Sequence, residues 1–311
     1  MNNGHRLYEA INGVHHKDYM PDFLFATKVE PFFNSYFYAK LYSDKSLTEI
    51  LYGKCEEWLY IPKTYLVNCS GVFYNQNREV ISKEQAKIIL TSLTNVVLKP
   101  TIGGNSGKGV VVCQLDNGID LKTGFDIKTL LDDREINYIV QERMRQHESI
   151  SMIYPHSVNT IRTITYILDG KIYCADLSLR IGSGGKSVDN IHAGGLVIGI
   201  SNEGLLLRYA YMLGYSDSSL RFEKHPDTGF IFENHVIAGI PQIILSAKKL
   251  HGITPHVGLI SWDFMVTEDG APCLIEANYW GQSAWFPQIV HGKPLFGENT
   301  LRLLSLLKNK Q

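Results

Sequence analysis

Oxygen-bearing side chains occur on both predicted strands of the stretch WDFMVTEDGAPCLIEANYW, whereas an apolar hairpin would keep its charges at the turn. The Asp269–Gly270 pair between two apolar runs predicts a tight turn, because both residues accept positive φ. A two-residue turn there, or a four-residue loop around it, places Asp263 opposite Glu276 and puts Asn278 on the same strand face. A three- or five-residue loop would break this convergence.

This arrangement of acids predicts a missing positive charge. Two carboxylates directly opposite each other destabilise a sheet, and removing them from water would cost far more. Oxygen ligands without His or Cys favour Mg²⁺, with Mn²⁺ as the alternative, and Mg²⁺ usually shares its coordination shell with nucleotide phosphates. An exposed hairpin with solvated acids explains the same residues without a metal.

The stretch LKPTIGGNSGKGVVV contains a glycine-rich loop. It differs from a Walker A motif, because Lys108 is followed by Gly109 and a predicted strand rather than by Ser or Thr and a helix. We expect a flap between two antiparallel strands, with backbone amides that can bind phosphate and with Lys99 on the first strand. A plain long hairpin turn would explain the glycines equally well.

Two arginines flank a long hairpin predicted in NTIRTITYILDGKIYCADLSLRIG. Pairing about Asp169–Gly170 puts Arg162 opposite Leu177, with Arg180 farther along near the strand end. Arg162 shares its strand face with Ile164, so we expect its charge to be neutralised. A phosphate or carboxylate ligand suits the planar guanidinium, and an internal salt bridge suits it equally.

A carboxylate-bearing connection is predicted after the strand NYIVQERM. Gln141 and Glu142 end this strand, and Glu148 follows shortly afterwards. A chain crossing between two lobes here would offer backbone groups to a base and a carboxylate to a ribose. The residues alone do not require this interpretation.

The element pattern predicts an α+β protein with mainly antiparallel sheets. ISKEQAKIILTSL is an amphipathic helix capped by Ser82, and three hairpins follow residue 146 before two C-terminal helices. This order lacks the regular βαβ alternation of a doubly wound fold.

Composition excludes several classes of protein. The net charge of −1 over 311 residues gives no electrostatic footprint for nucleic acid or an anionic membrane. The N-terminal MNNGHRLYEA lacks a signal-peptide core, and no stretch reaches the ~18 apolar residues of a membrane span. Five cysteines without a close pair suit a reducing compartment, so we expect a cytoplasmic protein without a transmembrane segment. The GxSxG, HExxH and CxxC motifs of other enzymes are absent.

Taken in chain order, the motifs resemble the ATP-grasp superfamily over about Asp44 to Asn299. These motifs are Lys99 with the glycine-rich loop, the strand end at Gln141 and Glu142, the two arginines and the final acidic hairpin. Four stretches most resemble its sugar-transfer-associated branch, whose members occur with polysaccharide biosynthesis functions. They are QHESISMIYPHSVNTIRTIT, VDNIHAGG, HPDTG and LIEANYWGQS. The resemblance implies two α+β lobes that clamp ATP between antiparallel sheets. The domains it implies are an N-terminal extension (1–44), a small lobe with the flap (45–142) and a large lobe with the metal-binding hairpin (143–311).

The resemblance also implies a role for each motif residue. Asp263, Glu276 and Asn278 would bind two Mg²⁺ ions, and Arg162 and Arg180 would be catalytic. Nucleotide-binding positions are Lys45, Lys99, Gly103, Gly104, Ser106, Gly107, Lys108 and Gly109 for the phosphates, Gln141 and Glu142 for adenine, and Glu148 for ribose. Candidates for acceptor binding, in turn regions that a plain turn also explains, are Asn190, His192, His225, Asp227 and Thr228.

The activity expected from the resemblance is an ATP-dependent carboxylate–amine ligase that forms an amide through an acyl phosphate. Its substrates would be a small carboxylate and an amine, the acid being a nucleotide-linked or glycan-linked uronic acid. A kinase acting on a sugar or another small acceptor, and a non-catalytic nucleotide-binding subunit, are the alternatives. Only about 44 residues precede DKS, too few for the separate α/β domain of many relatives. Substrate recognition is therefore expected from the lobes, the aromatic-rich N-terminus or a partner protein.

Overall fold

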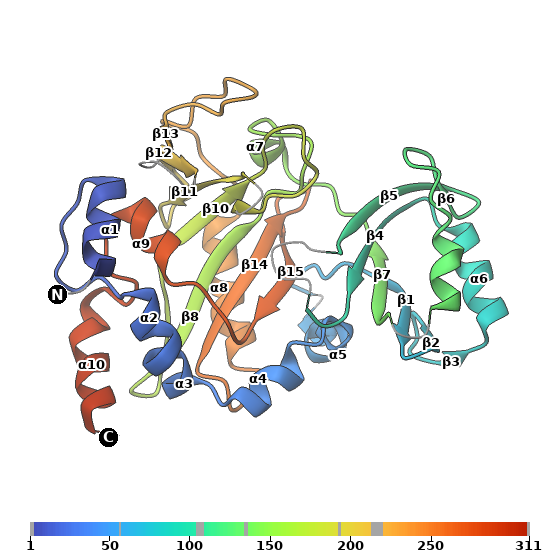
Figure 1. Cartoon of the computed structure of the whole chain (residues 1–311), viewed down its shortest axis with the longest axis horizontal. Coiled ribbons are helices and arrows are strands. Elements are labelled where there is room, and N and C mark those ends of the chain that lie inside the picture. Colours follow the sequence, from blue (N-terminus) through green and yellow to red (C-terminus); the bar gives the residue numbers. More distant parts are fainter. Residues whose placement is uncertain are drawn as a thin grey trace. The chain divides into compact units, whose positions relative to one another are not determined.

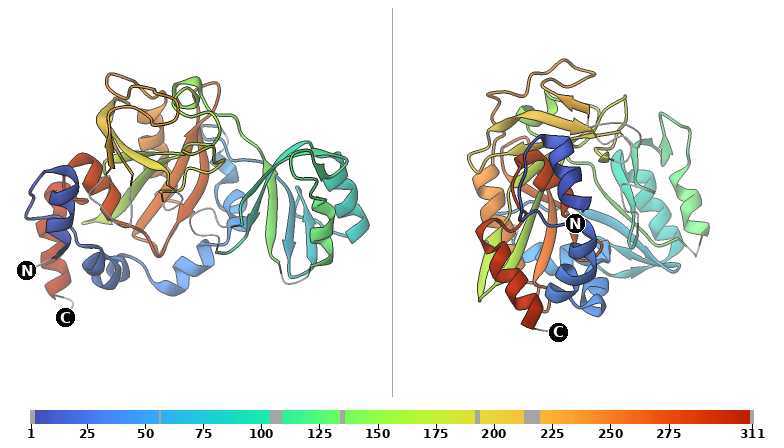
Figure 2. Two further views of the ribbon diagram at one scale, coloured as in Figure 1. Left: turned by 45° about the horizontal axis from the view of Figure 1, so that its top comes forward. Right: turned by 60° about the vertical axis from the view of Figure 1, so that its left-hand side comes forward.

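A computed structural model describes residues 3–55, 57–103, 109–133, 136–191, 194–212 and 220–309 of the chain (Figures 1 and 2). The chain forms two compact units. The large unit comprises Met1–Ser43, Glu57–Tyr60 and Gln146–Gln311, and the small unit comprises Asp44–Glu56 and Ile61–Arg145. The small unit is therefore an insertion in the sequence of the large one.

The small unit is built on a seven-stranded antiparallel sheet with the strand order β3-β2-β1-β7-β4-β5-β6. Its strands are β1 (Thr64–Cys69), β2 (Val72–Asn75), β3 (Val80–Ile81), β4 (Asn95–Pro100), β5 (Val111–Asp116), β6 (Ile119–Asp120) and β7 (Tyr138–Glu142). Its helical segments are η2 (Lys45–Leu47), α5 (Thr48–Tyr52), η3 (Gly53–Cys55), α6 (Lys83–Ser92) and η5 (Ile127–Asp132).

Helices α6 and η5 cover one face of this sheet with a continuous apolar core, to which α6 contributes Ala86 and Leu90. The N-terminus of α6 carries a capping box. Ser82 accepts a hydrogen bond from the Gln85 amide at 3.2 Å, and the Gln85 side chain accepts one from the Ser82 amide at 2.8 Å. The predicted cap and the predicted antiparallel pairing of β4 with β5 are both confirmed.

The large unit contains an eight-stranded antiparallel sheet, in which β13-β12-β11-β10-β8-β14-β15 follow one another and β9 pairs with β8. Its strands are β8 (Ile161–Leu168), β9 (Lys171–Cys174), β10 (Leu177–Ile181), β11 (Leu196–Ile200), β12 (Leu206–Met212), β13 (Leu220–Phe222), β14 (Leu259–Val266) and β15 (Pro272–Asn278). The predicted α+β class with mainly antiparallel sheets is confirmed.

The register of the long hairpin differs from the prediction by one residue. Leu168 pairs with Lys171 as expected, but Arg162 lies opposite Ser178 rather than Leu177, because the chain gains a residue between β9 and β10. A one-residue slip moves side chains to the other face of a sheet. Arg180 therefore shares a face with Ser178 and Arg162, whereas the predicted register would have put the two arginines on opposite faces.

The β14–β15 hairpin also contains an irregularity. Val266 pairs with Pro272, so five residues lie between the strands, which would break the expected convergence. A bulge between Leu274 and Glu276 restores the register, and Asp263 lies opposite Glu276 as predicted. The predicted pairing is confirmed, although the turn that produces it is longer than expected.

Helices cover both faces of the large sheet. The segments are α1 (Asn3–Asn12), α2 (Asp22–Leu24), the π-helical turn η1 (Phe25–Val29), α3 (Glu30–Phe33), α4 (Tyr36–Tyr42), α7 (Glu148–Ser151), α8 (Ile240–His251), α9 (Trp285–His291), η7 (Gly297–Asn299) and α10 (Thr300–Asn309). Phe25 and Val29 pack with Leu303 against Ile164 and Leu259 on the face that carries Arg162. Across the described ranges, no helix is long and apolar enough to cross a membrane.

A buried hydrogen-bond chain ties α8 to the opposite face of the sheet. Trp262 Nε1 donates to Thr165 Oγ1 at 2.7 Å, and Thr165 Oγ1 lies 2.6 Å from His251 Nδ1. His251 Nε2 lies 3.0 Å from the Val257 carbonyl oxygen, which requires that nitrogen to carry the proton. Burial lowers the pKa of His251 from 6.5 to about 4, so the imidazole is neutral at neutral pH.

We expect His251 to make the fold acid-labile. Its folded pKa lies below its unfolded value, so its contribution is complete above pH 6.5 and declines as the pH falls towards 4. At 1.36 kcal/mol per pKa unit, the loss is about 3 kcal/mol. Urea unfolding between pH 4 and 7.5 should give His251→Gln a shallower pH dependence than the wild type. Equal slopes would contradict the assignment.

Candidate active site

Arg162 and Asp263 form a buried, two-bonded ion pair between neighbouring strands. They lie directly opposite each other on β8 and β14. Arg162 Nε donates to Asp263 Oδ1, and Arg162 Nη2 donates to Asp263 Oδ2 at 2.8 Å. The guanidinium also lies 5.5 Å from the centre of the Phe286 ring of α9. Cross-strand pairing and this aromatic cover fix the arginine in one orientation.

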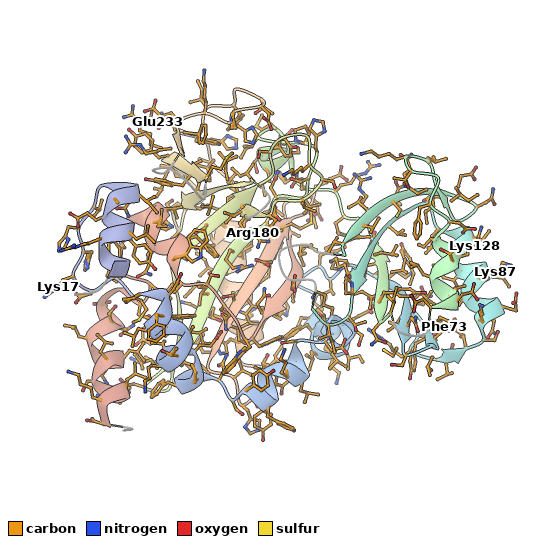
Figure 3. The ribbon with its side chains drawn as sticks, viewed as in Figure 1. Lys17, Phe73, Lys87, Lys128, Arg180 and Glu233 are labelled. Atoms are coloured by element: carbon orange, nitrogen blue, oxygen red, sulfur yellow. The ribbon has the colours of Figure 1, made fainter. Side chains whose placement is uncertain are left out.

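Arg180 lies next to this pair and is held by two further residues. Its Nε and Nη2 donate to Thr160 Oγ1 at 2.9 and 2.6 Å, and Nε lies 3.3 Å from Asp189 Oδ2. Its Nη2 lies 3.4 Å from Asp263 Oδ2. Burial would lower the pKa of Arg180, but Asp189, Asp263 and Glu276 together raise it above its ordinary value. The guanidinium therefore stays charged on the large sheet, where Figure 3 labels it.

Asp189, which the stretch SVDNIHAGGL offers beside Asn190 and His192, and Thr160 hold Arg180, a role that the sequence did not reveal. Asp189 Oδ2 accepts from both the amide and the hydroxyl of Thr160, which joins the loop after β10 to the start of β8. Asp189 directly precedes the predicted Asn190. Because a buried arginine needs a carboxylate partner, the sequence could have indicated Asp189 as the partner of Arg180. Asn190 is half-buried in the same loop, whereas His192 lies outside the described residues.

The acids of the hairpin are partly balanced by the protein itself. Burial would raise the pKa of Asp263, but Arg162 and Arg180 outweigh it and hold that pKa below its ordinary range. Asn278 Nδ2 lies 3.4 Å from Asp263 Oδ2 and 3.4 Å from the Ser261 carbonyl oxygen. The positive charge beside these acids therefore does not have to come from a metal alone, because Arg162 and Arg180 supply much of it.

A metal ion still fits this cluster by charge and by donor type. Three carboxylates, those of Asp189, Asp263 and Glu276, act on Arg180. Glu276 and Asn278 add hard oxygen donors on the face of Asp263, the type that Mg²⁺ prefers. Within the part of the chain that the structure describes, no three His, Cys, Asp or Glu side chains form a metal cluster. The predicted set contains only two carboxylates, and its third member is an amide.

The small unit brings several predicted phosphate-binding residues together. Lys45 Nζ donates to the Gly103 carbonyl oxygen at 3.0 Å, and the Lys45 amide donates to Thr101 at 2.8 Å. Gly109 has φ of +78°, and a Cβ there would lie 2.9 Å from Pro100 Cγ, so only glycine fits. The predicted Gly104, Ser106, Gly107 and Lys108 lie outside the described residues.

Lys99 and Gln141 share the face of the small sheet opposite α6. Lys99 pairs with Ile139, and Gln141 lies two residues beyond Ile139 on β7. Gln141 is buried, and its Nε2 donates to Thr64 Oγ1 at 3.1 Å. Glu142 ends the strand in the small unit, whereas the exposed Glu148 begins α7 in the large unit.

The side chains of the HPDTG turn hold neighbouring loops, and only His225 among them is buried. His225 is fully buried, donates through Nε2 to the Gly182 carbonyl oxygen at 2.9 Å, and accepts at Nδ1 from the Asp227 amide at 3.2 Å. Asp227 Oδ2 accepts from the Gly184 amide at 2.6 Å, and Thr228 Oγ1 donates to the Ile153 carbonyl oxygen at 2.8 Å. Both ring nitrogens of His225 are thus engaged within the protein, and the predicted contact of His225 with the acceptor stays a prediction.

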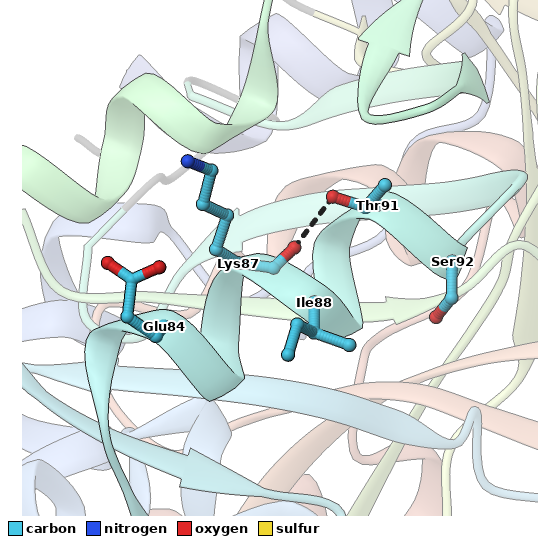
Figure 4. Close-up of a pocket in the computed structure, with 5 residues that line it drawn as sticks. All are labelled: Glu84, Lys87, Ile88, Thr91 and Ser92. Carbon is cyan, nitrogen blue, oxygen red and sulfur yellow. Dashed lines mark hydrogen bonds between the residues drawn. The ribbon is translucent and has the colours of Figure 1, made fainter.

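A shallow depression on α6 is unrelated to these residues (Figure 4). It is lined by Glu84, Lys87, Ile88, Thr91 and Ser92. All five side chains are exposed and come from one helix, and Thr91 Oγ1 donates to the Lys87 carbonyl oxygen at 2.8 Å. This surface carries none of the predicted site residues.

The sequence model of the sugar-transfer associated ATP-grasp family matches residues 24–302. This chain belongs to that family. The match includes the hairpin with Asp263, both arginines and the glycine-rich loop, and it establishes the ATP-grasp fold predicted from the sequence.

Several solved structures are similar to this chain at low sequence identity. D-alanyl-alanine synthetase A from Vibrio cholerae is 12% identical with a TM-score of 0.48, over 86% of this chain and 65% of that one. VanG D-Ala:D-Ser ligase from Enterococcus faecalis is 16% identical with a TM-score of 0.47, over 86% and 62%. D-alanine–D-alanine ligase from Bacillus anthracis, complexed with ATP, is 14% identical with a TM-score of 0.45, over 89% and 72%.

This chain thus spans less than two thirds of the length of the first two structures. No curated protein matches it. Because the TM-scores lie below 0.5, the family assignment depends on the sequence match alone.

Replacing Asp263 should destabilise the large unit. Asp263→Asn removes the carboxylate and leaves two largely buried guanidinium groups without their shared partner, which typically costs about 3–5 kcal/mol. Urea unfolding at pH 7 measures the loss. Glu203→Gln, an isosteric change at an exposed turn of the same unit, is the control and should change stability by less than about 0.5 kcal/mol. Equal stability of the two variants would show that the buried ion pair is not the main interaction of Asp263.

Proposed function

We propose that this protein is an ATP-dependent carboxylate–amine ligase that acts on a sugar acid or a related glycan precursor. The observation that carries the proposal is the cluster of Arg162, Arg180 and Asp263 on the sheet face that also carries Glu276 and Asn278. In a chain of the sugar-transfer associated ATP-grasp family, this cluster suits phosphoryl transfer to a carboxylate.

The small unit would bind the phosphates of ATP. Lys45 and Lys99 would offset their negative charge, and the glycine-rich loop from Gly103 to Gly109 would donate backbone amides to the phosphate oxygens. Gln141, on the same sheet face as Lys99, would line the adenine pocket. Glu142 would share that pocket, and Glu148 would accept from the ribose hydroxyls.

The hairpin would hold the metal that accompanies the nucleotide. Asp263, Glu276 and Asn278 would supply its protein oxygen ligands, and Mg²⁺, when bound, would neutralise charge on the phosphates. Asp263 would have two roles, because it would bind the metal and it also holds the two arginines.

The reaction needs no nucleophile from the protein. An oxygen of the substrate carboxylate attacks the γ-phosphorus, and the bond to the ADP oxygen breaks, which gives ADP and an acyl phosphate. The amine then attacks the acyl carbon, loses a proton and displaces inorganic phosphate to form the amide. Arg162 and Arg180 would stabilise the charge on the transferring phosphoryl group and on the acyl oxygen, so catalysis would depend on positioning and electrostatics.

The family description motivates a sugar acid as the acceptor. Asn190 and His192 follow Asp189 on the loop after β10, so they are the candidates for contact with this acceptor. Asp227 and Thr228 would act indirectly, by holding that loop and its neighbours.

Glu276→Gln should abolish turnover more cleanly than a change at Asp263. It removes one charge from the proposed metal ligands while Asp263 stays to hold the arginines, so we expect ATP turnover to fall at least ~100-fold in a folded protein. Steady-state ADP release and the melting temperature measure the two effects. Glu268→Gln, at the exposed turn of the same hairpin, should retain wild-type turnover. Wild-type turnover in Glu276→Gln would refute the metal assignment.

Coupled ADP release tests the proposed activity. The protein and Mg-ATP would be offered nucleotide-linked uronic acids, each with and without a pool of amino acids and small amines. We expect ADP formation that requires both an acid and an amine, with equimolar phosphate and an amide product. ADP formation with an acceptor alone, together with a stable phosphorylated product, would identify a kinase instead. Nucleotide binding without any ADP release would identify a non-catalytic subunit.

A further inference from the structure

The segment that follows the candidate metal ligands is anchored by a buried carboxylate near the N-terminus. Glu30, the first residue of α3, is 2% exposed. Its Oε2 accepts from the Gly281 amide at 3.1 Å, and its Oε1 accepts from the Gln282 amide at 2.9 Å. Burial raises the pKa of Glu30, and these hydrogen bonds oppose that rise. The carboxylate thus fixes two successive amides only three and four residues beyond Asn278.

Asn34 joins the two strands of the hairpin at the end away from its turn. Its Nδ2 donates to the carbonyl oxygens of Leu259 and Tyr279, both at 2.7 Å. Its Oδ1 accepts from the amides of Gly258 at 2.9 Å and Leu259 at 3.0 Å. One side chain therefore uses both donors and both acceptor positions of its amide to connect the start of β14 to the residue after β15.

The approach of α3 to this end of the hairpin depends on a glycine. The Gly258 amide donates to the Phe33 carbonyl oxygen at 3.1 Å, and a Cβ at Gly258 would lie 3.0 Å from the same oxygen. A larger residue there would push the helix away from the strand. The contact between Asn34 and β14 is thus made by the backbone as well as by the side chain.

A side-chain relay extends from Glu30 towards the site. Gln282, whose amide binds Glu30, accepts from Ser261 Oγ at 2.5 Å and donates through Nε2 to the Leu259 carbonyl oxygen at 3.2 Å. Ser261 lies opposite Asn278 and two residues before Asp263 on the same strand face. Asn278 Nδ2 donates to the Ser261 carbonyl oxygen at 3.4 Å, so the hydrogen-bonded path reaches one residue proposed to hold the metal.

These contacts matter for the alignment of β15, because it lies at the edge of the large sheet. Among the residues that the structure describes, β15 is the last strand of the sheet, and no neighbouring strand there aligns its outer backbone groups. At its beginning, Tyr60 exchanges hydrogen bonds with Pro272 and Leu274 at 2.8 and 2.9 Å. At its other end, where Asn278 lies, Glu30 and Asn34 provide the alignment.

We propose that Glu30 and Asn34 are positioning residues that fix the end of β15 and thereby the placement of Asn278 and Glu276. The N-terminal residues of the large unit, which the sequence analysis considered only for substrate recognition, thus belong to the machinery of the site. The inference rests on the proposed function in one respect, because its functional consequence is weaker use of Mg²⁺ in ATP turnover.

Two substitutions and two matched controls test the proposal. Glu30→Gln keeps the shape but replaces one acceptor oxygen with a donor, and Asn34→Asp removes both donated bonds. Glu9→Gln makes the first change at an exposed carboxylate of α1. Asn12→Asp makes the second change at an amide that binds the Ile289 carbonyl oxygen of α9 at 3.1 Å rather than the hairpin. The controls show how far any such substitution in the N-terminal segment changes hydrogen exchange and the Mg²⁺ requirement.

Hydrogen exchange of the peptide covering residues 275–283 is the first measurement. We expect about fivefold faster exchange in Glu30→Gln and Asn34→Asp, roughly the effect of losing one hydrogen bond, and no change in the controls. The second measurement is the Mg²⁺ concentration for half-maximal ATP turnover. It should rise at least about fivefold in the same two variants, with a smaller effect on the KM for the acceptor.

The outcomes separate this proposal from the proposed function. Unchanged exchange in residues 275–283 would overturn the positioning role, whatever the activity. Faster exchange with an unaltered Mg²⁺ requirement would show that Glu30 and Asn34 stabilise the hairpin without positioning the site, which also overturns it. A wild-type protein that releases no ADP would refute the proposed function. Hydrogen exchange of residues 275–283 in the variants and controls, measured with and without Mg-ATP, would still decide the positioning role.

Discussion

The buried ion pair between Arg162 and Asp263 is the interaction on which the arrangement of the site depends. Removing two charges from water costs several kcal/mol per ion, and only close two-bonded geometry offsets that cost. Asp263 meets this condition by lying directly opposite Arg162, and it lies within 3.4 Å of Arg180 as well. Because the Asp263 carboxylate lies beside both guanidinium groups, the spacing of the strands sets the distance between Arg162 and Arg180. The site therefore has a fixed shape before any ligand binds.

Two one-residue irregularities in the sheet make this geometry possible. The extra residue between β9 and β10 turns Arg180 to the face of Arg162, and the bulge before Glu276 returns that residue to a position opposite Asp263. A regular sheet with the same sequence would place one charged partner on the wrong face. Bulges next to functional sites often aim a side chain in this way, and both irregularities here do so.

Much of the fold was predictable because its signals are local. The Asp169–Gly170 turn, the cap at Ser82 and the alternation of apolar residues each depend on a few neighbours in sequence, and these elements are confirmed. The bulges were not predictable, because they depend on how each strand packs against its neighbours in the sheet rather than on the residues of a turn. The same reason hid the partner of Arg180, since Asp189 becomes its neighbour only when the loop after β10 folds back to Thr160. The burial of His225 was hidden for the same reason, because the Gly182 carbonyl oxygen that it binds lies 43 residues earlier in the sequence.

The division of the large unit between residues 1–43 and residues 146–311 has a consequence for folding during synthesis. The small unit can complete its contacts once residue 145 has left the ribosome, whereas β14 and β15 emerge more than 110 residues later. Until then, the apolar residues of the N-terminal segment, such as Phe25 and Val29, lack the sheet that buries them. Contacts between residues so far apart form slowly, and the exposed apolar surface favours association with other chains meanwhile. The N-terminal segment is thus synthesised first and is among the last parts to be buried.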